Sequence, residues 1–348
     1  MPDTNKLILL DGNSLTRDQV VAIACGRAHI ALDEAQLVHV QRAADFLAEK
    51  VSCGEPIYGV TTGFGSNADK LLGAHRARDE LPGAASIKHG PERREGTLLE
   101  ELQHNLVITH AVCVGKPFDA SVVRAMLVIR INTLMRGHSG IRVSTLQALT
   151  ELLNRDIVPV IPEKGSVGAS GDLAPLSHLA IVLLGGGEAF YHGERMPGAE
   201  ALRRAHLEPV RLSFKEGLAL NNGTTQMLAC AVLALDRLGK LIATADIAAA
   251  MTLDAFAGRT SAFRAEVHAL RPHPGQVETA RRMRAIHGSL SRLINNDPRI
   301  NQSGPAQADR IPGRFHASDR RHCRSIRLRF RRLHDDRRFA GRRLRSPA

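Results

Sequence analysis

The sequence predicts a mostly α-helical protein up to about residue 295. Over long stretches, apolar residues recur every three or four positions, which is the spacing of one face of an amphipathic helix. No alternation of strands with helices is visible, and this disfavours a doubly wound sheet. Two segments that are rich in glycine or proline, 54–70 and 159–171, break the helical pattern and are predicted as loops.

Residues that favour helix ends set the expected boundaries. Thr16 and Gln19 have the spacing of a capping box, and Asp119 and Ser144 are the expected N-caps of two later helices. Residues 191–194 are expected to turn a short hairpin. Helices are expected over residues 32–51, 97–113, 119–136, 143–154, 173–185, 198–206, 225–257 and 276–294.

The composition limits the class of protein and its compartment. The 348 residues are 43% hydrophobic, enough for a sizeable core, and with ten Phe, two Tyr and no Trp that core must rest on aliphatic residues. The longest apolar run, Met227 to Leu235, is well short of the roughly 20 residues that span a bilayer, so no membrane partner is expected. The N-terminus lacks the features of a secretion signal. Five scattered cysteines without CxxC spacing favour a cytoplasmic location over a disulfide framework.

The net charge of +12 is concentrated at the C-terminal end. Residues 301–348 hold 14 Arg, no Lys and four Asp, so they carry +10 of this charge. We therefore expect two regions: residues 1–300, with the helical pattern, and residues 301–348, an Arg-rich disordered tail. Two other interpretations of the tail remain open. One is an arm that binds nucleic acid, although few aromatic residues are present for base stacking; the other is translation out of frame from a GC-rich gene.

The most informative segment is 165–178, Gly-Ser-Val-Gly-Ala-Ser-Gly-Asp-Leu-Ala-Pro-Leu-Ser-His. It lacks the Gly-Lys-Ser/Thr end of a P-loop. It also lacks the Gly-x-Ser-x-Gly of a nucleophile elbow, because the residue two after Ser170 is Asp172. No predicted strand precedes it, which argues against a dinucleotide site. The simplest alternative is a Gly-rich turn in which Asp172 caps the next helix.

The tripeptide Ala169-Ser170-Gly171 permits an unusual backbone reaction. Gly171 has no Cβ and tolerates the angles that bring its nitrogen to the carbonyl of Ala169, which itself adds little bulk. Loss of water then leaves a carbon–carbon double bond at Ser170, conjugated to the new ring. The product is a methylidene-imidazolone, an electrophile that no ordinary side chain supplies.

Segment 165–178 resembles the signature of the aromatic amino acid ammonia-lyases, which form this prosthetic group autocatalytically. Two further loops resemble the same family: 58–65, Tyr-Gly-Val-Thr-Thr-Gly-Phe-Gly, and 217–224, Gly-Leu-Ala-Leu-Asn-Asn-Gly-Thr. The resemblance implies the helical fold of the ammonia-lyase superfamily.

The resemblance also implies roles for individual residues. Tyr58 is the expected acid/base beside the substrate, and Asn222 is expected to contact the prosthetic group and the substrate. Gly65 and Asp172 are expected to support the prosthetic group. Standing alone, Tyr58 would be interpreted as a packed loop aromatic and Asn222 as part of a turn. No dissociable cofactor is implied, and no metal site is expected, because the sequence contains no HExxH.

Thr109 and His110 indicate the substrate, because the matching positions of the family face the substrate ring. Phe-Leu at these positions is typical of phenylalanine-specific members, His-Leu of tyrosine-specific ones and Ser-His of histidine-specific ones. Thr-His is most similar to the last pair, since a hydroxyl beside an imidazole can hydrogen-bond a polar ring. A structural histidine is the simpler interpretation of His110. Phenylalanine or tyrosine ammonia-lyase and aminomutase activities remain alternatives.

The resemblance covers most of residues 5–295 and then ends. The Gln-Asp-x-Tyr-Ser-x-Arg-Cys segment that the family carries next is absent, as are a downstream glutamate and long helices of the central bundle. We therefore expect the N-terminal part and an incomplete central helical bundle, in a chain truncated or frameshifted after about residue 300. The family is homotetrameric, and we do not expect this chain alone to form the tetramer or to be stably active.

The predicted function is elimination of ammonia from L-histidine to give urocanate, at a methylidene-imidazolone formed from Ala169, Ser170 and Gly171. Tyr58 would remove the β-proton, and His110 would hold the imidazole ring. The expected partners are a small amino acid substrate and, in intact relatives, further copies of the chain. The alternative from a different class is a non-catalytic helical fragment, and only in that case is nucleic acid an expected partner, through the basic tail.

Overall fold

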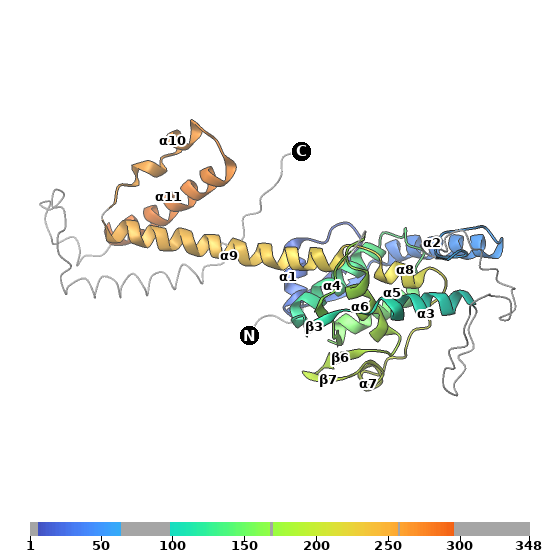
Figure 1. Ribbon diagram of the computed structural model, residues 1–348. Coiled ribbons are helices and arrows are strands. Elements are labelled where there is room, and N and C mark those ends of the chain that lie inside the picture. Colours follow the sequence, from blue (N-terminus) through green and yellow to red (C-terminus); the bar gives the residue numbers. More distant parts are fainter. Residues whose placement is uncertain (1–5, 64–97, 168–169, 257, 296–348) are drawn as a thin grey trace, which may run out of the picture. The chain divides into compact units, whose positions relative to one another are not determined.

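The structure, a computed structural model, describes residues 6–63, 98–167, 170–256 and 258–295 (Figure 1). Its compact units are Met1–Ala245 and Asp246–Ala348. Most of the described residues lie in helices, which confirms the expected mostly α class. The expected boundary between residues 300 and 301 lies outside the described residues, so the Arg-rich tail stays a prediction.

The helices of the first unit lie close to the ranges expected from the sequence. They are α1 (Arg17–Ala24), α2 (Glu34–Ser52), α3 (Leu98–His110), α4 (Ala120–Leu134), α5 (Val143–Asn154), α6 (Leu173–Leu183), α7 (Gly198–Arg204), α8 (Glu216–Asn221) and α9 (Thr225–Ala255), whose C-terminal part belongs to the second unit. The bounds predicted for α5 are those observed. The sequence pattern does not predict α8, because its six residues form fewer than two helical turns.

Side-chain caps decide only some of the helix starts. Thr16 and Gln19 form the expected capping box: Thr16 Oγ1 accepts from the Gln19 N–H at 3.3 Å, and Gln19 Oε1 accepts from the Thr16 N–H at 2.8 Å. Asp119 precedes α4 as expected, but its side chain makes no capping hydrogen bond. The prediction of Ser144 as an N-cap is wrong, because the N-cap of α5 is Arg142.

The buried carboxylate of Glu216 explains why α5 starts where it does. Glu216 has no exposed surface, and its Oε1 accepts from the Arg142 N–H at 3.1 Å and from Thr145 Oγ1 at 2.6 Å. Its Oε2 accepts from Arg142 Nη2 at 2.6 Å and from the Ser213 N–H at 2.7 Å. These bonds join the start of α5 to the start of α8. The N-terminus of α5 is therefore held by a tertiary contact with Glu216 and not by a side-chain cap from Ser144.

Three small sheets accompany the helices. They are the parallel pair β1 (Lys6–Leu10) and β2 (Ala28–Leu32), the antiparallel pair β3 (Val114–Pro117) and β5 (Pro162–Lys164), and the antiparallel set β4 (Val158–Pro159), β6 (Glu188–Tyr191) and β7 (Glu194–Pro197). The β6–β7 hairpin confirms the turn expected at residues 191–194. The β1–α1–β2 unit is a local strand–helix alternation that the sequence pattern does not reveal, because each strand is only five residues long.

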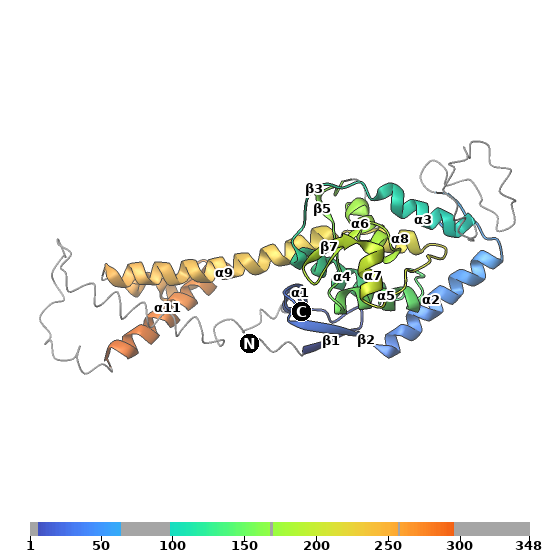
Figure 2. The same ribbon diagram turned by 90° about the horizontal axis from the view of Figure 1, so that it is seen from below.

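The core of the first unit is built around α4, against which α1 and α5 pack (Figure 2). Met126, Leu127, Val128 and Ile131 of α4 have no exposed surface. Because burying one such side chain contributes about 1.5–3 kcal/mol, α4 is the main apolar anchor of the unit. Helix α6 is also buried along most of its length. The core is largely aliphatic, as the composition predicts.

The second unit is smaller. It comprises the C-terminal part of α9, the 3-10 helix η2 (Thr260–Phe263), α10 (Ala265–Ala269) and α11 (Pro274–Asn295). Ala250, Met283 and Ile286 form its core, and Arg282 Nε lies 2.7 Å from Asp246 Oδ2. None of the site residues expected from the sequence lies in this unit. In the described ranges, no helix is both long enough and apolar enough to cross a membrane.

Replacing Glu216 by Gln tests the joint between α5 and α8. The change removes the charge that Arg142 and the Ser213 N–H bind, and we expect the free energy of unfolding to fall by about 3 kcal/mol. Glu151→Gln is the control, because the side chains of its ion pair with Arg155 are 42% and 44% exposed and the pair contributes at most about 1 kcal/mol. Denaturant unfolding measures both values. Equal losses in the two variants would contradict the role of Glu216.

Candidate active site

The loop before α6 has a backbone shape that favours glycine. Gly171 has φ +85°, in the left-handed region, and a Cβ at this position would lie 2.7 Å from Met227 Cε. A side chain is therefore disfavoured by the backbone angle, and it would also require the Met227 side chain to move. Ser170, the preceding residue, is half-buried. Ala169 lies outside the described residues, and so does Gly65 of the loop after Tyr58.

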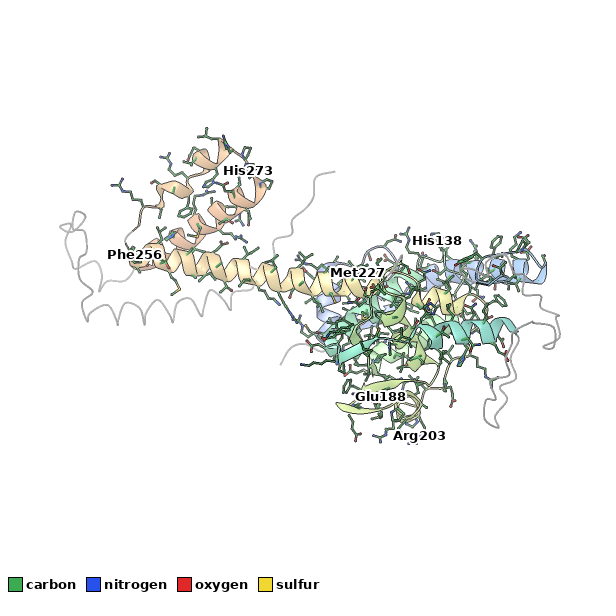
Figure 3. All side chains as sticks on the ribbon, viewed as in Figure 1. His138, Glu188, Arg203, Met227, Phe256 and His273 are labelled. Atoms are coloured by element: carbon green, nitrogen blue, oxygen red, sulfur yellow. The ribbon has the colours of Figure 1, made fainter. Side chains whose placement is uncertain are left out.

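Asp172 fixes this loop to the start of α9. Its carboxylate has no exposed surface; Oδ1 accepts from Ser166 Oγ at 2.7 Å, and Oδ2 accepts from the Met227 N–H at 2.9 Å. Met227, labelled in Figure 3, lies in the first turn of α9, where backbone N–H groups have no partner within the helix. The Asp172 side chain makes no capping bond to α6. Asp172 is thus the N-cap residue of α6 by position, as the simple turn predicts, but its carboxylate bonds to the start of a distant helix instead of capping α6.

The turn between α8 and α9 is bonded to α6. Asn221 is buried and donates from Nδ2 to Ser177 Oγ at 3.1 Å. The next residue, Asn222, is exposed. This bond holds the Asn222 turn to α6, and the Asp172 carboxylate bonds the Ser170 loop, which leads into α6, to the start of α9. The structure thus brings these two predicted site segments together.

Tyr58 lies after α2, and its side chain is 55% exposed. The carbonyl of the neighbouring Gly59 accepts from Gln103 Nε2 at 3.2 Å, and Gln103 Oε1 accepts from the Leu218 N–H at 3.3 Å. Gln103 has no exposed surface, so it ties the Tyr58 segment, α3 and α8 together. Motif comparison misses Gln103; its signal in the sequence is a polar residue within the apolar stripe of an amphipathic helix.

Thr109 and His110 lie in the last turn of α3. Thr109 Oγ1 donates to the Asn105 carbonyl at 2.7 Å, and His110 Nδ1 lies 2.8 Å from the Leu106 carbonyl. Because a carbonyl only accepts, Nδ1 carries the proton and Nε2 of the neutral ring is an acceptor. Thr109 is exposed and His110 is half-buried. Helix α3 packs against α6 and α8, so these two residues connect to the Ser170 loop through helices rather than through a direct bond.

His178 of α6 holds the segment that follows α3. The Cys113 N–H donates to His178 Nε2 at 3.1 Å, and burial lowers the pKa of His178. Burial also raises the pKa of the Cys113 thiol to about 11, so both groups are neutral at pH 7. Cys113 packs against the other end of the Ser170 loop, where a Cβ on Gly165 would lie 2.2 Å from Cys113 Sγ. This contact joins the end of α3 to the start of the loop.

The arrangement offers polar groups held on a rigid helical frame. Within the residues that the structure describes, no group of three or more His, Cys, Asp or Glu side chains could hold a metal ion. The predicted catalytic side chains lie in the Ser170 loop, the Asn222 turn and the Tyr58 segment.

This fold is that of the ammonia-lyases and aminomutases. The sequence model of the aromatic amino acid lyase family matches residues 15–310, and the chain belongs to this family. The match confirms the family that segments 58–65, 165–178 and 217–224 indicate.

Individual relatives resemble the chain over about 80% of its length or more. It is 47% identical to histidine ammonia-lyase of Gloeobacter violaceus over 276 residues, which are 79% of this chain and 49% of that protein. Histidine ammonia-lyase from Trypanosoma cruzi has a TM-score of 0.69 and 34% identity, over 80% of this chain and 50% of that one. Tyrosine aminomutase from Streptomyces globisporus has a TM-score of 0.70 and 32% identity, over 94% and 59%. The chain spans about half the length of the curated relatives it matches.

The buried His178 predicts a pH-dependent stability. Its pKa in the folded protein lies below the ordinary value of 6.5, so the unfolded chain takes up the proton first as the pH falls. We expect the free energy of unfolding to decrease from about pH 7 to about pH 5. The decrease should be smaller in His178→Gln, whose amide oxygen accepts the Cys113 N–H without titrating.

Thermal unfolding at several pH values measures this difference. His39→Gln is the control, because His39 is exposed on α2, and its profile should follow the unmodified chain. Parallel profiles for His178→Gln and the unmodified chain would contradict the prediction.

Proposed function

We propose that the site to which the predicted catalytic residues belong eliminates ammonia from L-histidine and releases urocanate; we do not expect this chain alone to be stably active. The histidine ammonia-lyase relatives and the Thr109-His110 pair support the substrate. The observation that carries the chemistry is the Ser170-Gly171 loop, which the buried Asp172 carboxylate bonds to the start of α9.

The residues around Ser170 fit a methylidene-imidazolone formed from Ala169, Ser170 and Gly171. Ring closure needs the Gly171 nitrogen to approach a carbonyl two residues earlier, and the left-handed backbone without a Cβ favours that approach. Asp172 supports the loop through its hydrogen bond from Ser166. When formed, the group supplies an electrophile that makes the substrate amine a better leaving group.

The side chains of the chain itself would handle the proton and the substrate. Tyr58 is our candidate for the base that removes the β-proton, because its side chain is half-exposed on a segment that Gln103 holds. Asn222 is our candidate for orienting the substrate, because the adjoining Asn221 is bonded to α6. We assign Gly65 to the support of the same site, as part of the loop after Tyr58.

His110 is our candidate for binding the imidazole ring of L-histidine. With its Nδ1 proton donated to the Leu106 carbonyl, its Nε2 accepts from a ring N–H. Thr109 adds a hydroxyl beside it. An aminomutase is the second candidate function, because the likeness to tyrosine aminomutase extends over nearly the whole chain.

We also propose that the active form of the intact protein is a homotetramer, in the cytoplasm. Helix α9 exposes Leu235, Leu238 and Leu241, by 53%, 48% and 64%. Their spacing of three residues places them along one side of the helix. An exposed apolar row of this kind is typical of a surface that another chain covers.

Ser170→Ala tests the prosthetic group independently of turnover. Ring formation releases two water molecules, one on cyclisation and one from the serine side chain, so mass spectrometry should find the peptide with residues 165–178 lighter by two waters. Ser170→Ala should abolish the double bond and any urocanate absorbance with L-histidine. Ser144→Ala, at an exposed serine of α5, is the control. A full-mass peptide from the unmodified chain would contradict the proposal for this chain.

The double variant Thr109→Phe, His110→Leu tests the substrate. Loss of the polar ring partner should lower the kcat/KM ratio of L-histidine over L-phenylalanine by at least about 10-fold. Assays of both substrates measure the ratio, and a β-amino acid product would identify an aminomutase. An unchanged ratio would show that these residues do not contact the ring.

A further inference from the structure

Arg130 places a positive charge inside the apolar core of the first unit. It lies in α4 between Ile129 and Ile131, and its side chain is 4% exposed. Among the described residues no carboxylate pairs with it, and its Nε has no hydrogen-bond partner. Burial lowers the pKa of its guanidinium to about 10, so the group stays charged at neutral pH. A buried cation without a carboxylate destabilises a core, so packing alone does not account for it.

The guanidinium bonds to the backbone before Asn222 and lies beside the backbone after it. Its Nη2 donates to the Ala219 carbonyl of α8. That carbonyl belongs to the last turn of the helix, where carbonyls have no partner within the helix. Its Nη1 faces Gly223, where a Cβ would lie 2.7 Å from this nitrogen. One planar side chain therefore reaches from the end of α8 to the turn that leads into α9.

The two contacts explain why arginine and glycine occur together here. Any side chain at Gly223 would collide with Nη1 and push the guanidinium away from the Ala219 carbonyl. A lysine has a single ammonium group that can bind the Ala219 carbonyl but does not fill the space beside Gly223, whereas the planar guanidinium does both. The scaffold side of this contact is α4, whose apolar side chains around Arg130 are buried in the core.

We propose that Arg130 is a positioning residue for Asn222. It fixes the backbone from Ala219 to Gly223 against α4, and this places the Asn222 side chain for the reaction. The role of Asn222 rests on the proposed function; the fixation of the turn by Arg130 does not.

Amide hydrogen exchange of the full 348-residue chain tests the fixation. In Arg130→Met, which keeps a long side chain without the charge, we expect exchange in residues 219–226 to rise by about 10-fold or more, the effect of losing one charge-assisted hydrogen bond. Arg130→Lys should give a smaller rise, because the ammonium keeps one of the two contacts. Exchange within α4 should stay at its original rate.

The control is Arg124→Met, on the same helix. Arg124 pairs with Asp156 at 2.7 Å, away from the turn, so this variant should leave residues 219–226 unchanged. Unchanged exchange of the turn in Arg130→Met would overturn the proposal, and so would an equal rise throughout α4. If Arg130→Met does not fold, Arg130→Lys is the deciding variant. Faster amide exchange confined to residues 219–226 supports the proposal, and exchange at the rates of the unmodified chain overturns it.

Kinetics separate positioning from general stability. With L-histidine, Arg130→Met should lower kcat more than it raises KM, while the peptide that contains Ser170 still loses two waters. Arg130→Lys should restore part of kcat. If the unmodified chain keeps the full mass at Ser170, the proposed function fails, and the exchange rates still decide whether Arg130 fixes the turn.

Discussion

The site depends above all on the buried carboxylate of Asp172. A carboxylate with no contact to water is tolerated only when protein donors replace the lost hydration. Here one donor is the Ser166 hydroxyl, within the same loop, and the other is the Met227 N–H, in the first turn of α9. Because each oxygen needs its own donor, the shape of the loop and the position of α9 are mutually dependent. Gly171, with its left-handed backbone, lies between these two donors in the sequence.

Two other buried polar side chains join elements in the same way. Glu216 bonds the start of α5 to the start of α8, and Gln103 bonds α3 to the Tyr58 segment and to α8. The aliphatic core around α4 supplies most of the stabilising burial, but it does not distinguish one register of the helices from another. Hydrogen bonds with few permitted geometries make that distinction, and they lie where the predicted site segments meet.

Long helices, the capping box at Thr16 and the hairpin at residues 191–194 were predictable because their signals are local in the sequence. The family was predictable because the motif around Ser170 is contiguous in the sequence, whereas the roles of its residues stay predictions. The groups that hold the N-terminus of α5 were not predictable, because Glu216 bonds to it from 74 residues away. Gln103 and Arg130 were missed for the same reason: a polar residue in an apolar stripe reveals its partner only after the chain has folded.

The bonds of the site also connect distant parts of the chain. Asp172 and Met227 are 55 residues apart, and Gln103 and Leu218 are 115 apart. During synthesis the loop around Ser170 emerges complete well before the residue that satisfies the second oxygen of Asp172. A nascent chain that stops short of Met227 therefore contains the whole loop but lacks the donor that holds it in place. The site can therefore be completed only after the start of α9 has been synthesised.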